Sequence, residues 1–384
     1  MARKIKKQKA KPSVAELMVS LSDDFTKAGF LGDSEELQIM PSIFPSFNRA
    51  SLIGGLPSAC ICEFHGPNQG GKTTLGLGLL VSAQRHGHLV GIVDGEGGLK
   101  NNKGQVNKWP NSLGLSLEKG KAIYVLGRKK SFEDVADKVN ESIEKFLEFQ
   151  EKNKEAKDTW FIWMVDSLTS LVPKKELEGS IGDANYGLHA NLASRWLKKL
   201  NNLILGTNIT VMFINQERKK INAKPFEKDW HSACGEALQY YAHFRVRVAR
   251  ANRIKLSEIH AGWKHNFTVE KNKVSACDEH GCFFTSTGRH DSLPLGWDMP
   301  RLYVTEGLNQ GIVAKEGKKV SCDYNEDTKE GMFESKLIEL IRKDSDAVAW
   351  FLKQFEERQD DAGKKEEECD SNRLEEGSKE EDNS

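Results

Sequence analysis

The chain carries Gly66-Pro67-Asn68-Gln69-Gly70-Gly71-Lys72-Thr73 between an apolar segment that ends at His65 and a helical pattern that follows. This segment fits the pattern G-x-x-x-x-G-K-[ST], which requires a strand before it and a helix after it. Its glycines let backbone N–H groups close around phosphate oxygens, and Lys72 adds positive charge beside the β and γ phosphates. The segment therefore predicts an ATP-binding loop, to which residues 66–74, including Thr74, contribute.

Two acidic residues are expected beside this loop because each follows an apolar strand. Trp160-Phe-Ile-Trp-Met-Val165 ends in Asp166, and Leu89–Val93 runs into Asp94-Gly95-Glu96. Ligands bind at the carboxyl ends of parallel strands, so both carboxylates should lie at one edge of a sheet. We expect Thr73 and Asp166 to hold Mg²⁺, and Glu96 to orient the water that attacks the γ-phosphate. The alternative for Glu96 is a surface charge on a loop.

Between about Pro45 and Ala251, apolar runs typical of strands alternate with helical patterns. The expected strands are Ala59–His65, Leu89–Val93, Ala122–Val125, Trp160–Val165, Thr210–Ile214 and Phe244–Val248. The expected helices are Lys72–His86, Ser131–Glu151, Leu188–Leu205 and, near the end, Met332–Phe355. This alternation predicts an α/β fold with a mostly parallel central sheet flanked by helices.

Composition places the chain among globular proteins. Its 384 residues are 38% hydrophobic and carry a formal net charge of zero, enough for one large domain with small appendages. No apolar run approaches the ~20 residues of a membrane span, and the basic residues 1–11 lack the apolar stretch of a secretory signal. Seven scattered cysteines favour a reducing compartment. We expect a cytoplasmic protein without membrane contact.

Charge is segregated toward the two ends of the chain. Lysine and arginine crowd residues 3–11, whereas residues 356–384 carry thirteen Asp or Glu against five Lys or Arg. We expect this acidic tail to be disordered, and the neutral total does not exclude a polyanionic partner. Residues 13–29 place apolar side chains at helical spacing, which predicts a short amphipathic helix.

Several further segments, in order along residues 40–275, resemble the bacterial RecA recombinase family. Leu177-Glu-Gly-Ser-Ile-Gly-Asp183 is similar to the first DNA-binding loop of that family. Phe213-Ile-Asn-Gln216-Glu-Arg218-Lys219-Lys220-Ile221 is similar to the start of the second loop, and Gly235–Ala242 to its end. Lys271-Asn-Lys273 resembles the lysine pair that reaches the ATP phosphates of a neighbouring subunit.

The resemblance implies a RecA-like ATPase core and a role for several residues. Gln216 would sense the γ-phosphate, Trp109 would lie against the adenine, and Lys271 and Lys273 would act across a subunit boundary. The N-terminal amphipathic helix would be a polymerisation element, although a helix folded onto its own core is the alternative. We thus expect five parts: a basic extension (1–12), the polymerisation element (13–44), the core with its DNA-binding loops (45–275), the end of the core with a reduced C-terminal domain (276–355), and the acidic tail (356–384).

The segment after Gln216 has its own chemical signature. Cations alternate there with apolar and aromatic residues, which suits phosphates and exposed bases of single-stranded DNA. We expect DNA contacts from Arg218, Lys219, Lys220, Ile221, Lys224, Lys228 and Trp230, and from Lys198 on the helix over 188–205. A mobile loop with incidental lysines is the alternative, as is a solvated helix face for Lys198.

Cys277, His280 and Cys282 could suggest zinc ligands, but no second ligand pair at the usual spacing accompanies them. A hairpin with reduced thiols is the preferred interpretation.

We therefore expect an ATP- and Mg²⁺-dependent recombinase that forms a helical filament on single-stranded DNA and exchanges strands with homologous duplex DNA. Its further partners would be single-strand-binding proteins and mediator or loading proteins. The protein would act in the cytoplasm of a bacterial cell or of a cell infected by a phage. One alternative is a ring-forming helicase motor on the same core. Another is a binding paralogue that hydrolyses ATP poorly, which the presence of Lys72, Thr73, Glu96 and Asp166 argues against.

Overall fold

The computed structural model describes residues 38–101, 103–180, 187–219, 230–232, 236–277, 279–359 and 361. The chain divides into two compact units, Met1–Leu37 and Gln38–Ser384, and every described residue belongs to the second unit. The helix predicted over residues 13–29 and the basic extension therefore lie outside the described residues.

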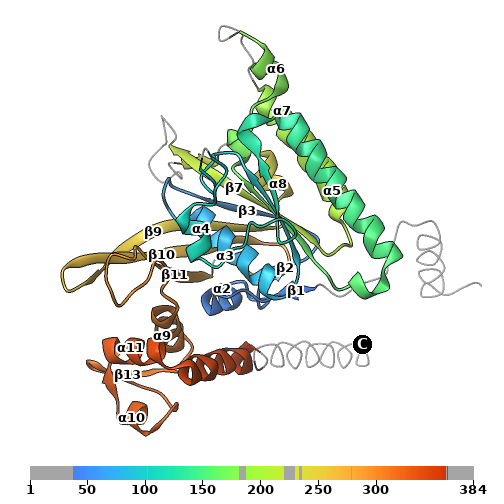
Figure 1. Cartoon of the computed structure of the whole chain (residues 1–384). Coiled ribbons are helices and arrows are strands. Elements are labelled where there is room, and N and C mark those ends of the chain that lie inside the picture. The colour runs from blue at the N-terminus through green and yellow to red at the C-terminus, as the bar shows by residue number, and fades with distance from the viewer. Residues whose placement is uncertain are drawn as a thin grey trace, which may run out of the picture. The chain divides into compact units, whose positions relative to one another are not determined.

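A mixed sheet forms the centre of the second unit, with strands in the order β12-β11-β10-β9-β3-β7-β6-β4-β5 (Figure 1). The strands from β9 to β5 in this order are parallel. They are β3 (Cys60–Gly66), β4 (Leu89–Asp94), β5 (Ile123–Leu126), β6 (Phe161–Asp166), β7 (Ile209–Lys219) and β9 (Phe244–Leu256). The antiparallel strands β10 (Ile259–Asn272), β11 (His280–Ser286) and β12 (Gly296–Trp297) extend the sheet beyond β9. The predicted α/β fold with a mostly parallel sheet is confirmed.

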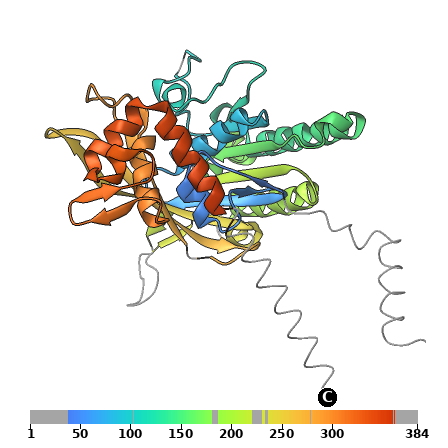
Figure 2. The same cartoon turned by 90° about the horizontal axis from the view of Figure 1, so that it is seen from below.

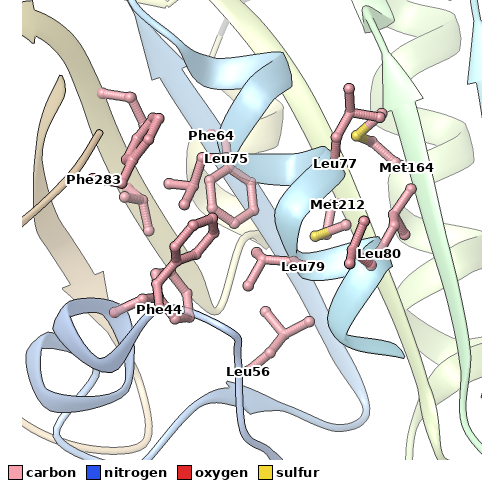
Figure 3. Close-up of a cluster of buried hydrophobic side chains, with 14 of the residues drawn as sticks. Phe44, Leu56, Phe64, Leu75, Leu77, Leu79, Leu80, Met164, Met212 and Phe283 are labelled. Atoms are coloured by element: carbon pink, nitrogen blue, oxygen red, sulfur yellow. The ribbon is translucent and has the colours of Figure 1, made fainter. Parts of the chain in front are cut away.

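Helices cover both faces of the sheet. Successive side chains of a strand point to opposite faces, and the apolar ones on each face are buried against these helices. Ile162 and Met164 of β6 pack with α3 (Lys72–Arg85) on one face. Figure 3 shows Met164 beside the leucines of α3. Trp163 and Val165 pack on the other face with α5 (Phe132–Lys152) and α7 (Leu188–Ile204). Burial on both faces explains why β4 and β6 are apolar up to their final Asp.

Shorter elements connect these layers. They are β1 (Ile39–Met40), α2 (Pro45–Ala50), β2 (Leu56–Pro57), α4 (Lys108–Ser112), η1 (Gly127–Lys129), η2 (Lys154–Ala156), η3 (Leu168–Ser170), α6 (Lys174–Glu178), β8 (Trp230–Ser232) and α8 (Ala237–Tyr241). β1 pairs with β2, and Phe44 is fully buried in the core cluster that contains α3. Met40 and Phe44 thus pack in this core, within the range 13–44 that was predicted to be the polymerisation element.

A small C-terminal subdomain has a core of its own, built around Val304, Ile341 and Phe351. It consists of α9 (Met299–Asn309), β13 (Ala314–Glu316), β14 (Lys319–Ser321), α10 (Glu326–Lys329), β15 (Met332–Phe333), α11 (Glu334–Lys343) and a helix over 345–359. α9 lies beside α2 (Figure 2), where Arg49 forms an ion pair with the buried Glu306.

Two boundaries in this region differ from the prediction. The continuous helix predicted over Met332–Phe355 is interrupted, since Met332 and Phe333 form a strand and Asp344 separates two helices. Asp344 has an extended backbone and its side chain accepts hydrogen bonds from the N–H groups of Asp346 and Ala347, so it begins the second helix. That helix continues to residue 359, so the tail predicted from 356 begins inside it.

Candidate functional site

The predicted phosphate loop connects β3 to α3 and depends on glycine at two positions. Gly66 and Gly71 have φ angles of 148° and 107°. A Cβ atom at Gly66 would lie 2.0 Å from the carbonyl oxygen of Val248, and one at Gly71 would lie 2.4 Å from Nδ1 of His265. Both glycines are therefore required by close packing as well as by backbone conformation. Gly71 is the N-cap of α3, so the N–H groups of the first helical turn point toward an incoming anion.

Lys72 begins α3, and its side chain turns back over the loop. Nζ donates hydrogen bonds to the carbonyl oxygens of Gly66 (3.1 Å) and Pro67 (2.8 Å), and the residue is 6% exposed. Burial lowers the pKa of the Lys72 ammonium, while the charges of Asp166 and Glu96 act in the opposite direction. Lys72 is thus a buried donor, for which phosphate oxygens would be stronger acceptors than the two carbonyls.

Thr73 and Asp166 form a pair of oxygen ligands at the end of the loop. Thr73 Oγ1 donates a hydrogen bond of 2.7 Å to Oδ2 of Asp166. Burial raises the pKa of Asp166 to about 7, and the carboxylates of Glu96 and Asp94 add to this rise. A hard divalent cation with oxygen ligands fits this pair, because it would neutralise the crowded negative charge. Thr73 and Asp166 are the residues that would hold Mg²⁺ with ATP.

Glu96 lies on a turn between β4 and α4 and contacts two neighbours. Its Oε1 accepts hydrogen bonds from Ser167 Oγ (3.2 Å) and from Gln216 Nε2 (3.1 Å). The turn is fixed by the buried Asp94, whose carboxylate accepts from the backbone N–H groups of residues 97–99. The two acidic residues of Asp94-Gly95-Glu96 therefore differ in role: Asp94 shapes the turn, and Glu96 faces the phosphate loop.

A pocket of about 570 Å³ joins these groups, a volume typical of small-molecule sites. Of the residues predicted from sequence, it is lined by Asn68, Gln69, Gly70, Gly71, Lys72, Thr73, Thr74, Glu96, Trp109, Asp166 and Gln216. Gly66 and Pro67, at the start of the loop, do not line the pocket, but their carbonyl groups accept hydrogen bonds from Lys72. Backbone donors, a lysine, two oxygen ligands and an aromatic ring together suit a nucleoside triphosphate.

One wall of the pocket comes from residues that the sequence did not single out. They are Ile214, Arg250, Trp263, His265, Thr285, Ser286, Thr287, Arg289 and Leu295. The guanidinium groups of Arg250 and Arg253 lie 4.3 Å and 5.2 Å from the centre of the Trp263 ring, which supports cation–π contacts. No strand was predicted over Gly262-Trp263-Lys264-His265, and nothing in these residues indicated that they border the phosphate loop.

His265 packs against the phosphate loop and contacts its backbone. Its Nδ1 lies 2.7 Å from the carbonyl oxygen of Gly70, and its Nε2 lies 3.1 Å from Thr285 Oγ1. The ring also stacks on Phe283, with 4.6 Å between ring centres. Burial lowers the pKa of His265 to about 4, so the imidazole is neutral and donates from Nδ1 to Gly70.

Comparison with known proteins connects this geometry to a family. The sequence model of the RecA N-terminal domain matches residues 15–119 and 137–282, which include the phosphate loop, Glu96, Asp166 and Gln216. The chain belongs to the RecA family. The resemblance that the motifs indicated is therefore confirmed over more than half of the chain.

Curated relatives extend the similarity along most of the chain. Protein RecA of Salinispora tropica is 29% identical over 323 residues, which cover 84% of this chain and 84% of that protein. Protein RecA of Salinispora arenicola is 28% identical over 345 residues, 89% of this chain and 90% of that protein. With protein RecA of Syntrophus aciditrophicus the identity is 33% over 243 residues, 63% of this chain and 64% of that protein.

Lys271 and Lys273 lie away from the nucleotide pocket of this RecA-family chain. Lys271 pairs with Arg245, which pairs with Glu63, three residues before Gly66. Its Nζ donates to the carbonyl oxygens of Gln239 (2.8 Å) and Tyr240 (3.3 Å) in α8. Neither lysine lines the pocket.

Of the predicted DNA-binding residues, Lys220, Ile221, Lys224 and Lys228 lie outside the described residues, as do residues 181–183 of the segment similar to the first loop. β7 continues past its predicted end at Ile214 through Arg218 to Lys219, and β8 returns antiparallel with Trp230 opposite Lys219. The segment after Gln216 therefore begins and ends in paired strands, which the sequence did not indicate. Lys198 is exposed on α7.

Cys277, His280 and Cys282 have separate surroundings. Burial raises the pKa of Cys282 to about 11, His280 Nδ1 lies 2.9 Å from Thr268 Oγ1, and Cys277 is exposed. Among the described residues, no group of three or more His, Cys, Asp or Glu is arranged to hold a metal ion. In the same part of the chain, no helix is both long enough and apolar enough to cross a membrane.

Proposed function

We propose that this RecA-family chain is an ATP-dependent DNA recombinase that assembles into a helical filament on single-stranded DNA and exchanges strands with homologous duplex DNA. The observation that carries the proposal is the hydrogen bond between Glu96 and Gln216 at the pocket. It links the phosphate end of the pocket to β7, the strand that leads into the lysine-rich segment after Gln216.

ATP hydrolysis would use the groups that line the pocket. Lys72 and the N–H groups of the loop stabilise negative charge on the β and γ phosphates, and Thr73 and Asp166 hold Mg²⁺. The bound Mg²⁺ offsets phosphate charge. Glu96 orients the attacking water, and Trp109 packs against the base. Lys271 and Lys273 of a neighbouring subunit complete the site, so that nucleotide binding favours the filament.

DNA binding would depend on the segment that follows Gln216. Arg218, Lys219, Lys220, Lys224 and Lys228 neutralise phosphates, while Ile221 and Trp230 contact bases, and Lys198 adds charge from α7. When Gln216 turns toward the γ-phosphate, β7 transmits the change to this segment. ATP then raises DNA affinity, and DNA must raise ATP affinity by the same factor. Base pairing tests homology, because the protein contacts mainly the DNA backbone.

A three-strand exchange assay tests this function. Circular single-stranded DNA and homologous linear duplex are mixed with the full-length protein, with and without ATP and Mg²⁺, and with heterologous duplex as a control. We expect nicked circular product only with ATP and homologous DNA. ATP hydrolysis without product, together with closed rings in electron micrographs, would instead indicate a translocating motor. Single-strand-binding and loading proteins, expected in the cytoplasm of a bacterial or phage-infected cell, can be added to the same assay.

A further inference from the structure

A buried cluster of charged side chains lies directly behind the phosphate loop, outside the nucleotide pocket. His65 is fully buried at the end of β3, and side chains from three neighbouring strands surround it. These are Glu217 of β7, Arg245 and Arg247 of β9, and Glu270 of β10, together with Glu63 of β3 itself. Buried charges on this scale cost stability unless they are paired, so the pairing pattern decides what the cluster does.

His65 faces a carboxylate with each ring nitrogen. Nδ1 lies 3.2 Å from Oε1 of Glu217, and Nε2 lies 3.0 Å from Oε2 of Glu270. A neutral imidazole has one N–H group and can donate to one of these carboxylates, whereas an imidazolium ion donates to both. Both contacts can therefore be hydrogen bonds at the same time only when His65 is protonated.

The three bridged residues are adjacent in sequence to the three segments that the proposed function requires to act together. His65 directly precedes Gly66 of the phosphate loop, Glu217 directly follows Gln216, and Glu270 directly precedes Lys271. A single peptide bond joins the two residues of each pair, so a shift of the strand end moves both side chains of that pair. The bridge thus connects the chain's own nucleotide loop, its γ-phosphate sensor and the lysines proposed to serve a neighbour.

We propose that His65 is a positioning residue that couples the phosphate loop to the Gln216 and Lys271 segments by bridging the carboxylates of Glu217 and Glu270. This inference rests on the proposed function, because it assigns the coupling between ATP and DNA to a particular contact. His65 does not line the nucleotide pocket, so it would act through its partners.

Other charges around His65 bear on its protonation. Burial opposes the charged form, but the nearby carboxylates of Glu217, Glu270 and Glu63 outweigh it, and the pKa of His65 is raised although Arg245 acts against this. Arg247 holds Glu217 through two hydrogen bonds of 2.8 Å and 3.1 Å, and Lys72 of α3 adds positive charge near Glu217. The bridge is therefore complete below the ordinary histidine pKa of ~6.5 and is lost as pH rises through the raised value. Arg247 keeps Glu217 in place after that loss, whereas the link to Glu270 is weakened.

The test measures the ratio of ATP turnover with and without single-stranded DNA, at closely spaced pH values between about 6 and 9. For the full-length protein we expect this ratio to fall with rising pH through the titration of His65. In His65→Gln the ratio should be roughly tenfold lower at low pH and independent of pH, since the amide carries its donors on a single nitrogen and has an acceptor oxygen in place of the second donor. His280→Gln is the matched control, because His280 is exposed on β11, and it should keep the wild-type profile.

Circular dichroism and the thermal midpoint establish that each variant is folded. Glu217→Gln should lower the same turnover ratio, because it removes one of the two carboxylates that His65 bridges. The ratio of the double variant should be no lower than that of the more impaired single variant, because both changes remove one coupling. A folded His65→Gln protein with the wild-type ratio and pH profile would overturn the inference. So would additive losses in the double variant.

A wild-type protein that shows no stimulation by DNA at any pH would reject the proposed function, and the coupling is then measured without DNA. The probe is an ATP analogue with a slowly hydrolysed γ-thiophosphate, and the readout is amide hydrogen exchange in residues 209–219 at low pH. Nucleotide-dependent protection in the wild type that is lost in His65→Gln supports the inference. Equal protection in both proteins, or none in the wild type, rejects it.

Discussion

A hydrogen bond joins Glu96 and Gln216: Oε1 of Glu96 accepts from Gln216 Nε2 at 3.1 Å. Glu96 is the residue expected to orient water, and Gln216 the residue expected to sense the γ-phosphate. A γ-phosphate that attracts the Gln216 amide would therefore leave Ser167 as the remaining donor to this oxygen. Nucleotide binding would thus change the hydrogen bonds of Glu96 before hydrolysis.

The first prediction concerns Glu96. Glu96→Gln should slow ATP turnover by roughly 10²-fold, because the amide cannot accept a proton, while nucleotide affinity changes little. Steady-state hydrolysis and the binding of a fluorescent ATP analogue measure the two effects separately. Ser170→Ala, which changes a hydroxyl near the same turn, is a control for local disturbance. Loss of nucleotide binding in Glu96→Gln would show that Glu96 has been assigned the wrong role.

Lys72 gives a second prediction. Lys72→Ala and Lys72→Arg should each reduce turnover by roughly 10²-fold or more, because the compact ammonium lies between two carbonyl groups where a guanidinium does not fit. Lys329→Ala, on the surface of the C-terminal subdomain, should retain wild-type turnover. Turnover near the wild-type rate in both Lys72 variants would remove this residue from the mechanism.

The third prediction is the pH dependence of stability caused by His265. Its folded pKa is depressed to about 4, so the unfolded chain binds more protons than the folded one below pH ~6.5, and stability falls as pH decreases. Between pH 7.5 and pH 5 the loss from this group is about 2 kcal/mol. Urea unfolding at both pH values should show a smaller loss in His265→Gln than in the wild type by about that amount.

The predicted half of the pocket depended on residues that are local in sequence. Residues 66–74 contain a complete motif, and Asp166 and Glu96 follow apolar strands whose carboxyl ends must converge in a parallel sheet. The predictions for the loop, for Asp166 and for Glu96 needed no knowledge of distant packing. Asp94 shows the limit of the argument, because it follows the same strand as Glu96 yet hydrogen bonds to its own turn.

The other half of the pocket could not be predicted in this way. Trp263 and His265 lie on β10, nearly two hundred residues after the loop that they contact, and no motif surrounds them. Their position depends on the antiparallel pairing of β9, β10 and β11, which patterns of alternating residues do not specify. The same limit applies to β8, since its pairing with β7 was not evident from a segment rich in lysine.

Lys271 and Lys273 provide the fourth prediction. If they act on the nucleotide of a neighbouring subunit, mixing Lys271→Ala/Lys273→Ala protein with Lys72→Ala protein should restore part of the DNA-stimulated turnover. Some interfaces in the mixture then contain one intact half from each variant. Co-sedimentation on single-stranded DNA establishes that the two proteins assemble together. No recovery despite mixed assembly would indicate that both sets of lysines act within one chain.

The last prediction concerns the acidic segment over 362–384, which lies outside the described residues and carries nine Asp or Glu against four Lys or Arg. A tethered polyanion competes with DNA phosphates for a basic surface, and this competition weakens as salt screens both interactions. Deletion of 362–384 leaves the helix over 345–359 intact and should therefore tighten duplex binding most at low ionic strength, without changing ATP turnover on saturating single-stranded DNA. A second variant with the nine acidic residues replaced by Gln or Asn separates charge from length. Binding curves for the full-length and deleted proteins that converge only at high salt support competition, whereas curves that coincide at every salt concentration reject it.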